Sequence, residues 1–218
     1  MMFISINNKE TLNNNHIWLD KFERELYIPN FPNENEREPF GNIKQRIENN
    51  EYPKTTITLL VNNEQLVGGC IIDSYIECNS IEPIYLVINK NMRNKGYGKH
   101  LLEKSISNMT YAQHVFLEVD NPEKPINKEF ITIDPYKRLN MYLNWGFKIL
   151  NFNYVQPPLS KEGKPEENLL LLYKGNELNK DSLKEFLFCF YKGLGAEESE
   201  YLSKMYNEID NIDILLKN

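Results

Sequence analysis

A short glycine-containing segment carries the clearest chemical signal in this sequence. Residues 93–99 read Arg-Asn-Lys-Gly-Tyr-Gly-Lys and lie between a strongly apolar run and a segment with helical spacing. Glycine at positions 96 and 98 lets backbone N–H groups converge at a helix amino terminus, where the helix dipole favours an anion. The segment therefore predicts a pyrophosphate site, although a tight strand-to-helix turn without a ligand would have the same pattern.

One carboxylate interrupts an apolar strand. Glu118 lies within Val115–Val119, and the other four residues of this segment are all apolar. Burying a carboxylate without a partner is costly, so an acid in such a place is usually paired or functional. Glu118 is therefore a candidate proton acceptor, with a structural hydrogen-bonding partner as the alternative.

Composition excludes several other classes of protein. The chain has 218 residues and a formal charge of −6, which argues against sequence-independent nucleic-acid binding. No apolar run approaches the roughly 20 residues of a membrane helix, and the amino terminus lacks secretory features, so we expect a soluble, cytoplasmic protein without membrane partners. The cysteines and histidines are too scattered for a disulfide framework or a zinc site, so we expect no metal. These residues are Cys70, Cys78, Cys189, His16, His100 and His114.

The central part of the chain alternates strands and helices. Residues 55–61 and 65–72 are β-rich and flank a turn, which predicts an antiparallel hairpin. Residues 81–89, 96–109 and 115–119 predict a strand, a helix and a second strand, with the two strands parallel. A loop over 121–134 precedes a helix from Asp134 to about Trp145, and two more strands follow at 147–155 and 168–173.

Both ends of the chain are predicted to be helical. Apolar spacing indicates a helix that ends near Pro29 and Pro32, and a second helix from Glu36 to Ile47. The tail, Lys180–Asn218, predicts two amphipathic helices separated at residues 193–195. Its apolar residues are sufficient to pack on the core of the same chain or on another subunit. Homodimer formation is therefore one of two alternatives for the tail.

The motifs together resemble a known superfamily. Residues 93–98 fit the pattern Arg/Gln-x-x-Gly-x-Gly/Ala after a strand, which resembles the acetyl-CoA pyrophosphate loop of the Gcn5-related N-acetyltransferase (GNAT) superfamily. Tyr142, four residues before Gly146-Phe147, and Asn121, just after the intervening strand, are similar to the same superfamily. The resemblance covers roughly residues 55–155 and does not extend to the tail.

The resemblance implies a fold and a domain organisation. It implies an α/β (α+β) domain over residues 1–176, with a mixed, mostly antiparallel sheet, a splayed parallel strand pair and helices on both faces. Residues 177–218 would form a C-terminal helical extension.

It also implies how acetyl-CoA would bind as a cosubstrate. Backbone amides of residues 94–99 would hold the pyrophosphate, with the side chains of Arg93 and Lys95 nearby, and Asn121 would contact the pantetheine. The strand before the loop would hydrogen-bond the pantetheine arm, and one of its N–H groups would polarise the thioester carbonyl. The residues implied for the cofactor are Leu86, Val87, Ile88, Arg93, Asn94, Lys95, Gly96, Tyr97, Gly98, Lys99 and Asn121.

Catalytic roles follow from the same resemblance. Tyr142 would return a proton to the leaving CoA thiolate. Glu82, 11 residues before Arg93, stands where histone acetyltransferases of this superfamily carry their glutamate base. Glu118 is the second candidate for the base.

Three functions are compatible with these features to different degrees. The first is N-acetyl transfer from acetyl-CoA to a primary amine of a small molecule, peptide or protein, by direct attack in a ternary complex. The acceptor would lie between residues 16–50 and 154–167, which carry aromatics and acids such as Glu34, Glu36 and Glu38. The second is a non-catalytic acyl-CoA-binding module that acts through its helical tail. The third, a toxin that acetylates aminoacyl-tRNA, is disfavoured by the acidic charge.

Overall fold

The computed structural model describes residues 1–34, 37–124, 133–159 and 163–217, so the predicted Glu36 and the middle of the predicted loop 121–134 lie outside the described residues. The chain divides into two compact units, which are described separately below. The first unit comprises Met1–Ser74 and Ile81–Tyr111, and the second comprises Tyr75–Ser80 and Ala112–Asn218. Within the described ranges, no helix is long and apolar enough to cross a membrane.

The first unit is built on four strands. They are β1 (Met2–Ile6), β2 (Lys54–Asn62), β3 (Gln65–Tyr75) and β4 (Ser80–Ile88). Strands β2 and β3 pair antiparallel around the turn Asn63-Glu64, where both residues have positive φ (48° and 59°), as a two-residue hairpin turn requires. The predicted hairpin is therefore confirmed. Strand β1, which pairs antiparallel with β2, was not predicted, because this five-residue segment precedes a helical run.

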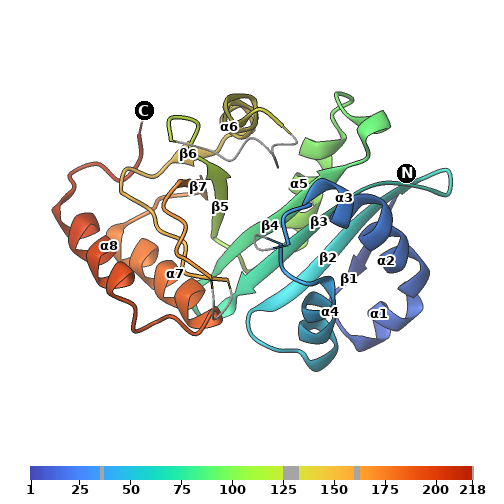
Figure 1. Ribbon diagram of the computed structural model, residues 1–218, viewed down its shortest axis with the longest axis horizontal. Coiled ribbons are helices and arrows are strands. Elements are labelled where there is room, and N and C mark those ends of the chain that lie inside the picture. The colour runs from blue at the N-terminus through green and yellow to red at the C-terminus, as the bar shows by residue number, and fades with distance from the viewer. Residues whose placement is uncertain (35–36, 125–132, 160–162, 218) are drawn as a thin grey trace. The chain divides into compact units, whose positions relative to one another are not determined.

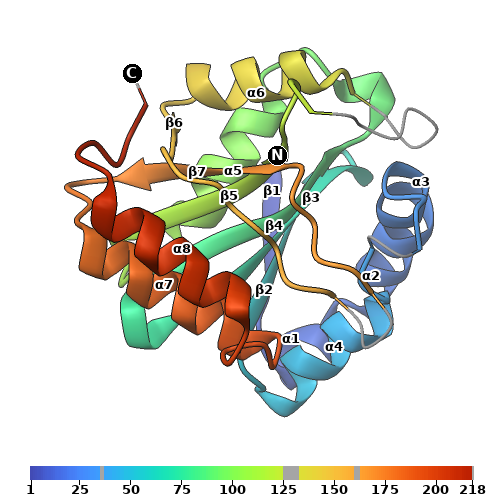
Figure 2. The same ribbon diagram turned by 60° about the vertical axis from the view of Figure 1, so that its left-hand side comes forward.

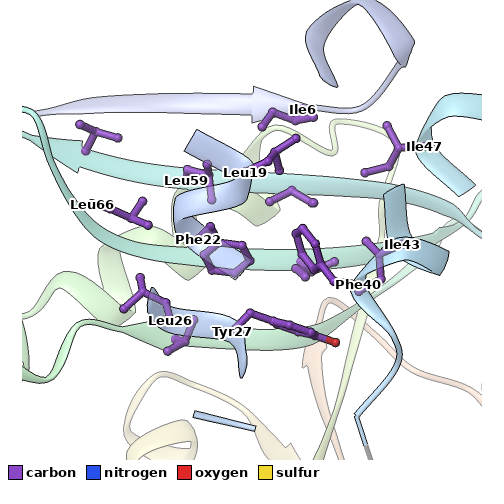
Figure 3. Packing of buried hydrophobic residues seen from close by; sticks show 14 residues of the cluster. Ile6, Leu19, Phe22, Leu26, Tyr27, Phe40, Ile43, Ile47, Leu59 and Leu66 are labelled. Atoms are coloured by element: carbon purple, nitrogen blue, oxygen red, sulfur yellow. The ribbon is translucent and has the colours of Figure 1, made fainter. Parts of the chain in front are cut away.

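Helices cover both faces of these strands, because side chains alternate between the two faces. A Cβ atom at Gly69 would lie 2.3 Å from the Phe22 ring, whereas one at Gly68 would lie 3.3 Å from Leu101 on the opposite face. Figure 3 shows Phe22, Tyr27 and Phe40 packed with the strand residues of a buried cluster. The helices are α1 (Lys9–Asn14), α2 (His16–Phe22), a π-helix (Glu23–Tyr27), α3 (Ile28–Asn30), α4 (Phe40–Asn49) and α5 (Tyr97–Ser107).

Two prolines decide where the amino-terminal helices change. The N–H of Ile28 bonds the carbonyl of Glu23, five residues earlier, which is the π-helical pattern, and Pro29 in the next turn has no N–H to donate to the carbonyl of Glu25. The prediction of a second helix from Glu36 was wrong at its start, because Pro39 is the N-cap and α4 begins at Phe40. The helix extends to Asn49, with Asn50 in the left-handed conformation at its end.

Among its described residues, the second unit contains the strands β5, β6 and β7 and the helices α6, α7 and α8 (Figure 2). Strand β7 (Leu169–Gly175) pairs antiparallel with both β5 (His114–Asp120) and β6 (Lys148–Ile149). The helices are α6 (Pro135–Asn144), α7 (Lys180–Gly193) and α8 (Glu200–Asn211), and short 3₁₀ turns cover Ile76–Cys78 in this unit and Lys90–Met92 in the first unit. Helices α7 and α8 lie side by side.

The tail helices pack on strands of their own unit. The ring of Phe186 on α7 stacks on Phe116 of β5, with centroids 3.8 Å apart and planes 11° apart. Tyr75, which is the last residue of β3 and belongs to the second unit, meets Phe186 edge-on at 5.6 Å. The break between α7 and α8 includes Gly195 at φ +66°. The two predicted tail helices are therefore confirmed, and their apolar face contributes to the core of the second unit.

Strand β6 is shorter than the predicted strand 147–155, so that prediction was wrong over most of its length. Only Lys148 and Ile149 pair with β7. Leu150 instead forms an isolated bridge with Leu216, and the N–H of Asn151 donates to the carbonyl of Leu215 at 2.8 Å. The end of the chain therefore takes the backbone hydrogen bonds that a longer β6 would have made with a strand.

Candidate active site

The predicted anion-binding segment connects β4 to α5 in the first unit. The N–H of Asn89 donates to the carbonyl of Val67 at 2.8 Å, and the Asn89 side chain accepts from the N–H of Asn91 at 3.1 Å. Asn94 (φ +61°) and Gly96 (φ +80°) then adopt left-handed conformations, which turn the chain into α5. Such conformations favour glycine and asparagine, which explains both residue types in the motif.

Helix α5 begins at an open end. Gly96 is its N-cap and has no side chain to satisfy the first N–H groups of the helix. A Cβ atom at Gly96 would meet nothing within 4 Å, and Asn94 and Lys95 are exposed. The first turn therefore presents N–H groups and the positive end of a helix dipole to open space, as anion binding requires.

The side chain of Arg93 is bound to the protein itself. Its Nε donates to the carbonyl of Ile88 at 3.1 Å, and one terminal nitrogen donates to Oδ1 of Asn30 at 2.6 Å. The other cations of the segment are more exposed. Lys95 contacts only the sulfur of Met92, at 3.9 Å, among the described hydrogen bonds, and Lys99 lies 3.8 Å from Glu103.

The predicted pantetheine residues lie at the end of β4. Val87 is buried, whereas Leu86 and Ile88 are half-buried. Strand β3 approaches this end closely at Gly68, where a Cβ atom would lie 2.6 Å from the carbonyl oxygen of Val87 and 2.5 Å from Cδ1 of Ile88. Only glycine allows this approach, so Gly68 contributes to the position of the strand end.

We expect Gly68→Ala to lower the free energy of unfolding by about 1–3 kcal/mol, because the new methyl group would push backbone and side-chain atoms of β4 aside. Urea unfolding of the two proteins measures this change. Gly41→Ala, in helix α4 with open space around the new atom, is the matched control and should be neutral or slightly stabilising. Equal stability of Gly68→Ala and the wild type would contradict the close approach.

Glu82 is the other functional candidate of the first unit. It lies in β4, six positions before Ile88, and only 1% of its surface is exposed. A carboxyl group this deeply buried needs polar partners or a proton, so its burial sets it apart from an ordinary surface acid at a strand start. The structure therefore places Glu82 in the same strand as the predicted pantetheine residues, as the sequence predicts.

Glu118 has the most strongly shifted pKa among the described acids of the second unit. The Tyr154 hydroxyl donates a short hydrogen bond to Oε1 of Glu118, and Nε2 of Gln156 donates to Oε2 at 2.6 Å. Burial raises the pKa of Glu118 to about 7, although the two donors oppose this shift. The carboxyl group is thus held at both oxygens and can exchange a proton near neutral pH.

Both partners of Glu118 are themselves held. Gln156 and Glu166 exchange two backbone hydrogen bonds of 2.9 Å, and the hydroxyl of Tyr191 on α7 donates to the carbonyl of Val155 at 2.6 Å. The sequence predicted Tyr154 and Gln156 only as parts of an acceptor wall. Their role toward Glu118 was missed because 36 and 38 positions separate them from it.

The pKa of Glu118 makes stability depend on pH. Because the folded pKa of about 7 exceeds the ordinary value of 4.5, the unfolded chain loses the proton first as pH rises. The contribution of Glu118 to stability is therefore fully present below pH 4.5 and is lost as pH rises to about 7, by at most about 3 kcal/mol. We expect Glu118→Gln to remove this contribution from the pH dependence of chemical unfolding measured across that range.

Glu123→Gln, at an exposed side chain just after β5, removes the same formal charge and is the control. A pH profile of Glu118→Gln that matches the wild type would contradict the perturbed carboxyl group.

Asn121 and Tyr142 complete the candidates of the second unit. Asn121 closes the turn after β5, because its N–H donates to the carbonyl of Asn168 at 2.8 Å and its Oδ1 accepts from the N–H of Glu123 at 3.1 Å. Tyr142 lies on α6, is 7% exposed, and meets the rings of Trp145 and Phe147 edge-on. The three candidates thus come from β5, the turn after it and α6.

A buried ionic network in the first unit was not predicted. Arg46 on α4 contacts the carboxylates of Glu38 and Asp73, and its Nε donates to the hydroxyl of Thr55 at 3.0 Å. The Thr55 hydroxyl in turn donates to Asp73 at 2.6 Å. Burial raises the pKa of Asp73 to about 6, although Arg46 and the Thr55 hydroxyl act to lower it. The network therefore joins Arg46 of α4 to Glu38, Thr55 and Asp73.

Comparison with known proteins supports the resemblance seen in the sequence. A family model described as the acetyltransferase (GNAT) family matches residues 21–128. No curated protein matches the chain at a significant level. Within the residues that the structure describes, no group of three or more His, Cys, Asp and Glu side chains could hold a metal ion.

Solved structures show the fold. A protein described as a GNAT-family acetyltransferase from Bacteroides thetaiotaomicron aligns with a TM-score of 0.63 and 17% identity, over 90% of this chain and 99% of that one. Gcn5 from Tetrahymena aligns with a TM-score of 0.53 and 16% identity, over 82% and 99%. The aminoglycoside 6'-N-acetyltransferase from Enterococcus faecium aligns with a TM-score of 0.52 and 18% identity, over 82% and 100%. The predicted fold class is confirmed.

Proposed function

Since the chain contains a domain of the acetyltransferase (GNAT) family over residues 21–128, we propose that it transfers an acetyl group from acetyl-CoA to a primary amine. The amine belongs to a small molecule, a peptide or a protein and attacks directly in a ternary complex. The observation that carries the proposal is the open amino terminus of α5, with Gly96 at φ +80° and exposed backbone in front of it. This end of the helix suits the pyrophosphate of CoA.

Acetyl-CoA would bind along β4 and the loop that follows. Backbone amides of residues 94–99 hold the pyrophosphate, and the exposed Lys95 adds positive charge. Backbone groups of residues 86–88 bond the pantetheine arm, and the N–H of Val87 or Ile88 polarises the thioester carbonyl. Asn121 contacts the pantetheine through the amide nitrogen, since Oδ1 already accepts from Glu123.

Glu118 is the base best supported by its surroundings. An amine reaches the enzyme as an ammonium ion and must lose a proton before its nitrogen attacks the thioester carbonyl carbon. A carboxylate with a pKa of about 7 is well matched to this transfer at neutral pH. Glu82, buried in β4, is the alternative base.

Tyr142 would complete the proton balance. The new C–N bond forms as the C–S bond breaks, and the CoA thiolate takes a proton from the Tyr142 hydroxyl. The nitrogen of the ammonium ion loses two protons in all. One replaces the proton of Tyr142 and the other leaves to solvent, so the products are CoA, an acetylated amine and one proton.

A panel of amines tests this proposal by release of the CoA thiol from acetyl-CoA. We expect release that depends on an added amine and double-reciprocal plots that intersect when both substrates are varied. Parallel plots would indicate an acetyl-enzyme intermediate and would contradict direct attack. The alternative, a non-catalytic acyl-CoA-binding module that acts through its tail, predicts binding of acetyl-CoA without turnover. It is less well supported, because the apolar face of α7 packs inside the second unit.

A further inference from the structure

We propose that Asn30 is a positioning residue for the cofactor loop and acts through Arg93. This inference rests on the proposed function, because the loop is taken to bind CoA. Asn30 is 63 positions from Arg93 in sequence, and no motif connects the two. Both residues belong to the first unit.

Arg93 fastens the loop to the end of β4. Its Nε donates to the carbonyl of Ile88, the last residue of the strand and five positions before Arg93, and so joins the two ends of this segment. One hydrogen bond to a carbonyl does not fix the orientation of a guanidinium group. A second hydrogen bond, to another nitrogen of the group, is needed to hold its plane in place. Asn30 provides that orientation, because its Oδ1 accepts from the terminal nitrogen of Arg93 at 2.6 Å.

Asn30 is held in turn by the irregular helix before it. Its Nδ2 donates to the carbonyl of Leu26 at 2.8 Å, so both ends of the side-chain amide are engaged and its orientation is fixed. Leu26 belongs to the π-helix Glu23–Tyr27, which ends two residues before Pro29. The chain of contacts therefore runs from the π-helix through Asn30 and Arg93 to Ile88, at the start of the loop.

This arrangement separates two roles for Arg93. If Arg93 bound the pyrophosphate by its charge, Asn30 would compete for the guanidinium, and its removal would leave CoA affinity unchanged or improve it. If Arg93 instead keeps the loop in its binding conformation, removal of Asn30 would weaken CoA binding, because part of the binding free energy would be used to order the loop. The two hydrogen bonds of Arg93 favour the second role.

Calorimetric titration of the full chain with CoA tests this inference. We expect Asn30→Ala to raise the Kd about tenfold, equivalent to about 1.4 kcal/mol. Asn30→Asp should retain near wild-type affinity, because its carboxylate can accept from Arg93 although it cannot donate to Leu26. Arg93→Lys should bind as weakly as Asn30→Ala, because a single ammonium group cannot replace the guanidinium fork.

Controls separate positioning from general stability. Asn30→Ala and Asn30→Asp both lose the bond to Leu26, and Asn30→Ala also loses the bond to Arg93, so the urea midpoint of Asn30→Asp should fall by no more than that of Asn30→Ala. A near wild-type CoA affinity of Asn30→Asp despite a lower midpoint separates positioning from stability. Glu25→Ala, at an exposed site of the π-helix, should change neither quantity. If Asn30→Ala does not fold, the Arg93→Lys result still decides between the two roles.

Two results would overturn the inference: Asn30→Ala or Arg93→Lys with wild-type affinity, or Asn30→Asp as weak as Asn30→Ala. A wild-type chain that binds no CoA would instead overturn the proposed function.

Discussion

Arg46→Met will lower the free energy of unfolding by about 3–5 kcal/mol, because it leaves the buried carboxylate of Asp73 and the partly exposed carboxylate of Glu38 without their cation. The side chain of Asp73 is 9% exposed, and Arg46 is the one cation that the described structure places against it. Arg46 also neutralises Glu38, whose side chain is 23% exposed. Methionine fills much of the same volume but supplies no charge and no donor.

The decrease in the free energy of unfolding caused by Arg46→Met should become larger as pH rises. Arg46 lowers the pKa of Asp73 from the value that burial alone would give, so without Arg46 the folded pKa rises above about 6. The folded chain then holds its proton to higher pH than the unfolded chain, and stability falls as pH rises through that range. Urea unfolding at pH values on both sides of about 6 measures the effect.

A surface ion pair is the control for Arg46. Lys9 and Glu48 lie 2.8 Å apart, with side chains 66% and 45% exposed, so Lys9→Met should change stability by less than about 1 kcal/mol. Arg46→Met combined with Asp73→Asn should recover part of the loss. A single Arg46→Met change no larger than that of Lys9→Met would contradict a buried network.

Tyr142→Phe will lower kcat by about 100-fold and leave CoA affinity unchanged, if the hydroxyl is the acid of the proposed reaction. The variant keeps the ring that packs on Trp145 and Phe147 and removes only the donor of the proton. Because the thiolate is a fairly good leaving group, some activity should remain. Steady-state rates with saturating amine, together with calorimetric titration by CoA, separate the two effects.

Tyr136→Phe is the matched control, since Tyr136 lies on the same helix and is 55% exposed. It should have wild-type kcat. A Tyr142→Phe variant with wild-type kcat, or one whose lost activity follows a lost urea midpoint, would contradict the acid role.

The parts of the fold that local sequence determines were predicted well. The β2–β3 hairpin, β4, α5 and the two tail helices follow from residue periodicity, turn residues and glycine positions. The loop after β4 was also predicted, because left-handed residues such as Gly96 leave a recognisable pattern.

Contacts between distant segments could not be predicted in the same way. The bonds from Tyr154 and Gln156 to Glu118, and from Asn30 to Arg93, join residues that share no local pattern. The length of β6 depends on the end of the chain, since Leu150 bridges to Leu216. Side-chain roles of this kind depend on tertiary packing, which periodicity does not specify.

The most direct test of acetyl transfer measures both products in one reaction. Acetyl-CoA and the best amine of the panel are incubated with the full chain, CoA is followed as free thiol, and the acetylated amine is identified and quantified by mass spectrometry. We predict equal amounts of the two products at every time point, and neither product when the amine is omitted. Tight binding of acetyl-CoA with no acetylated amine, or thiol release that does not depend on the amine, would contradict the proposed function.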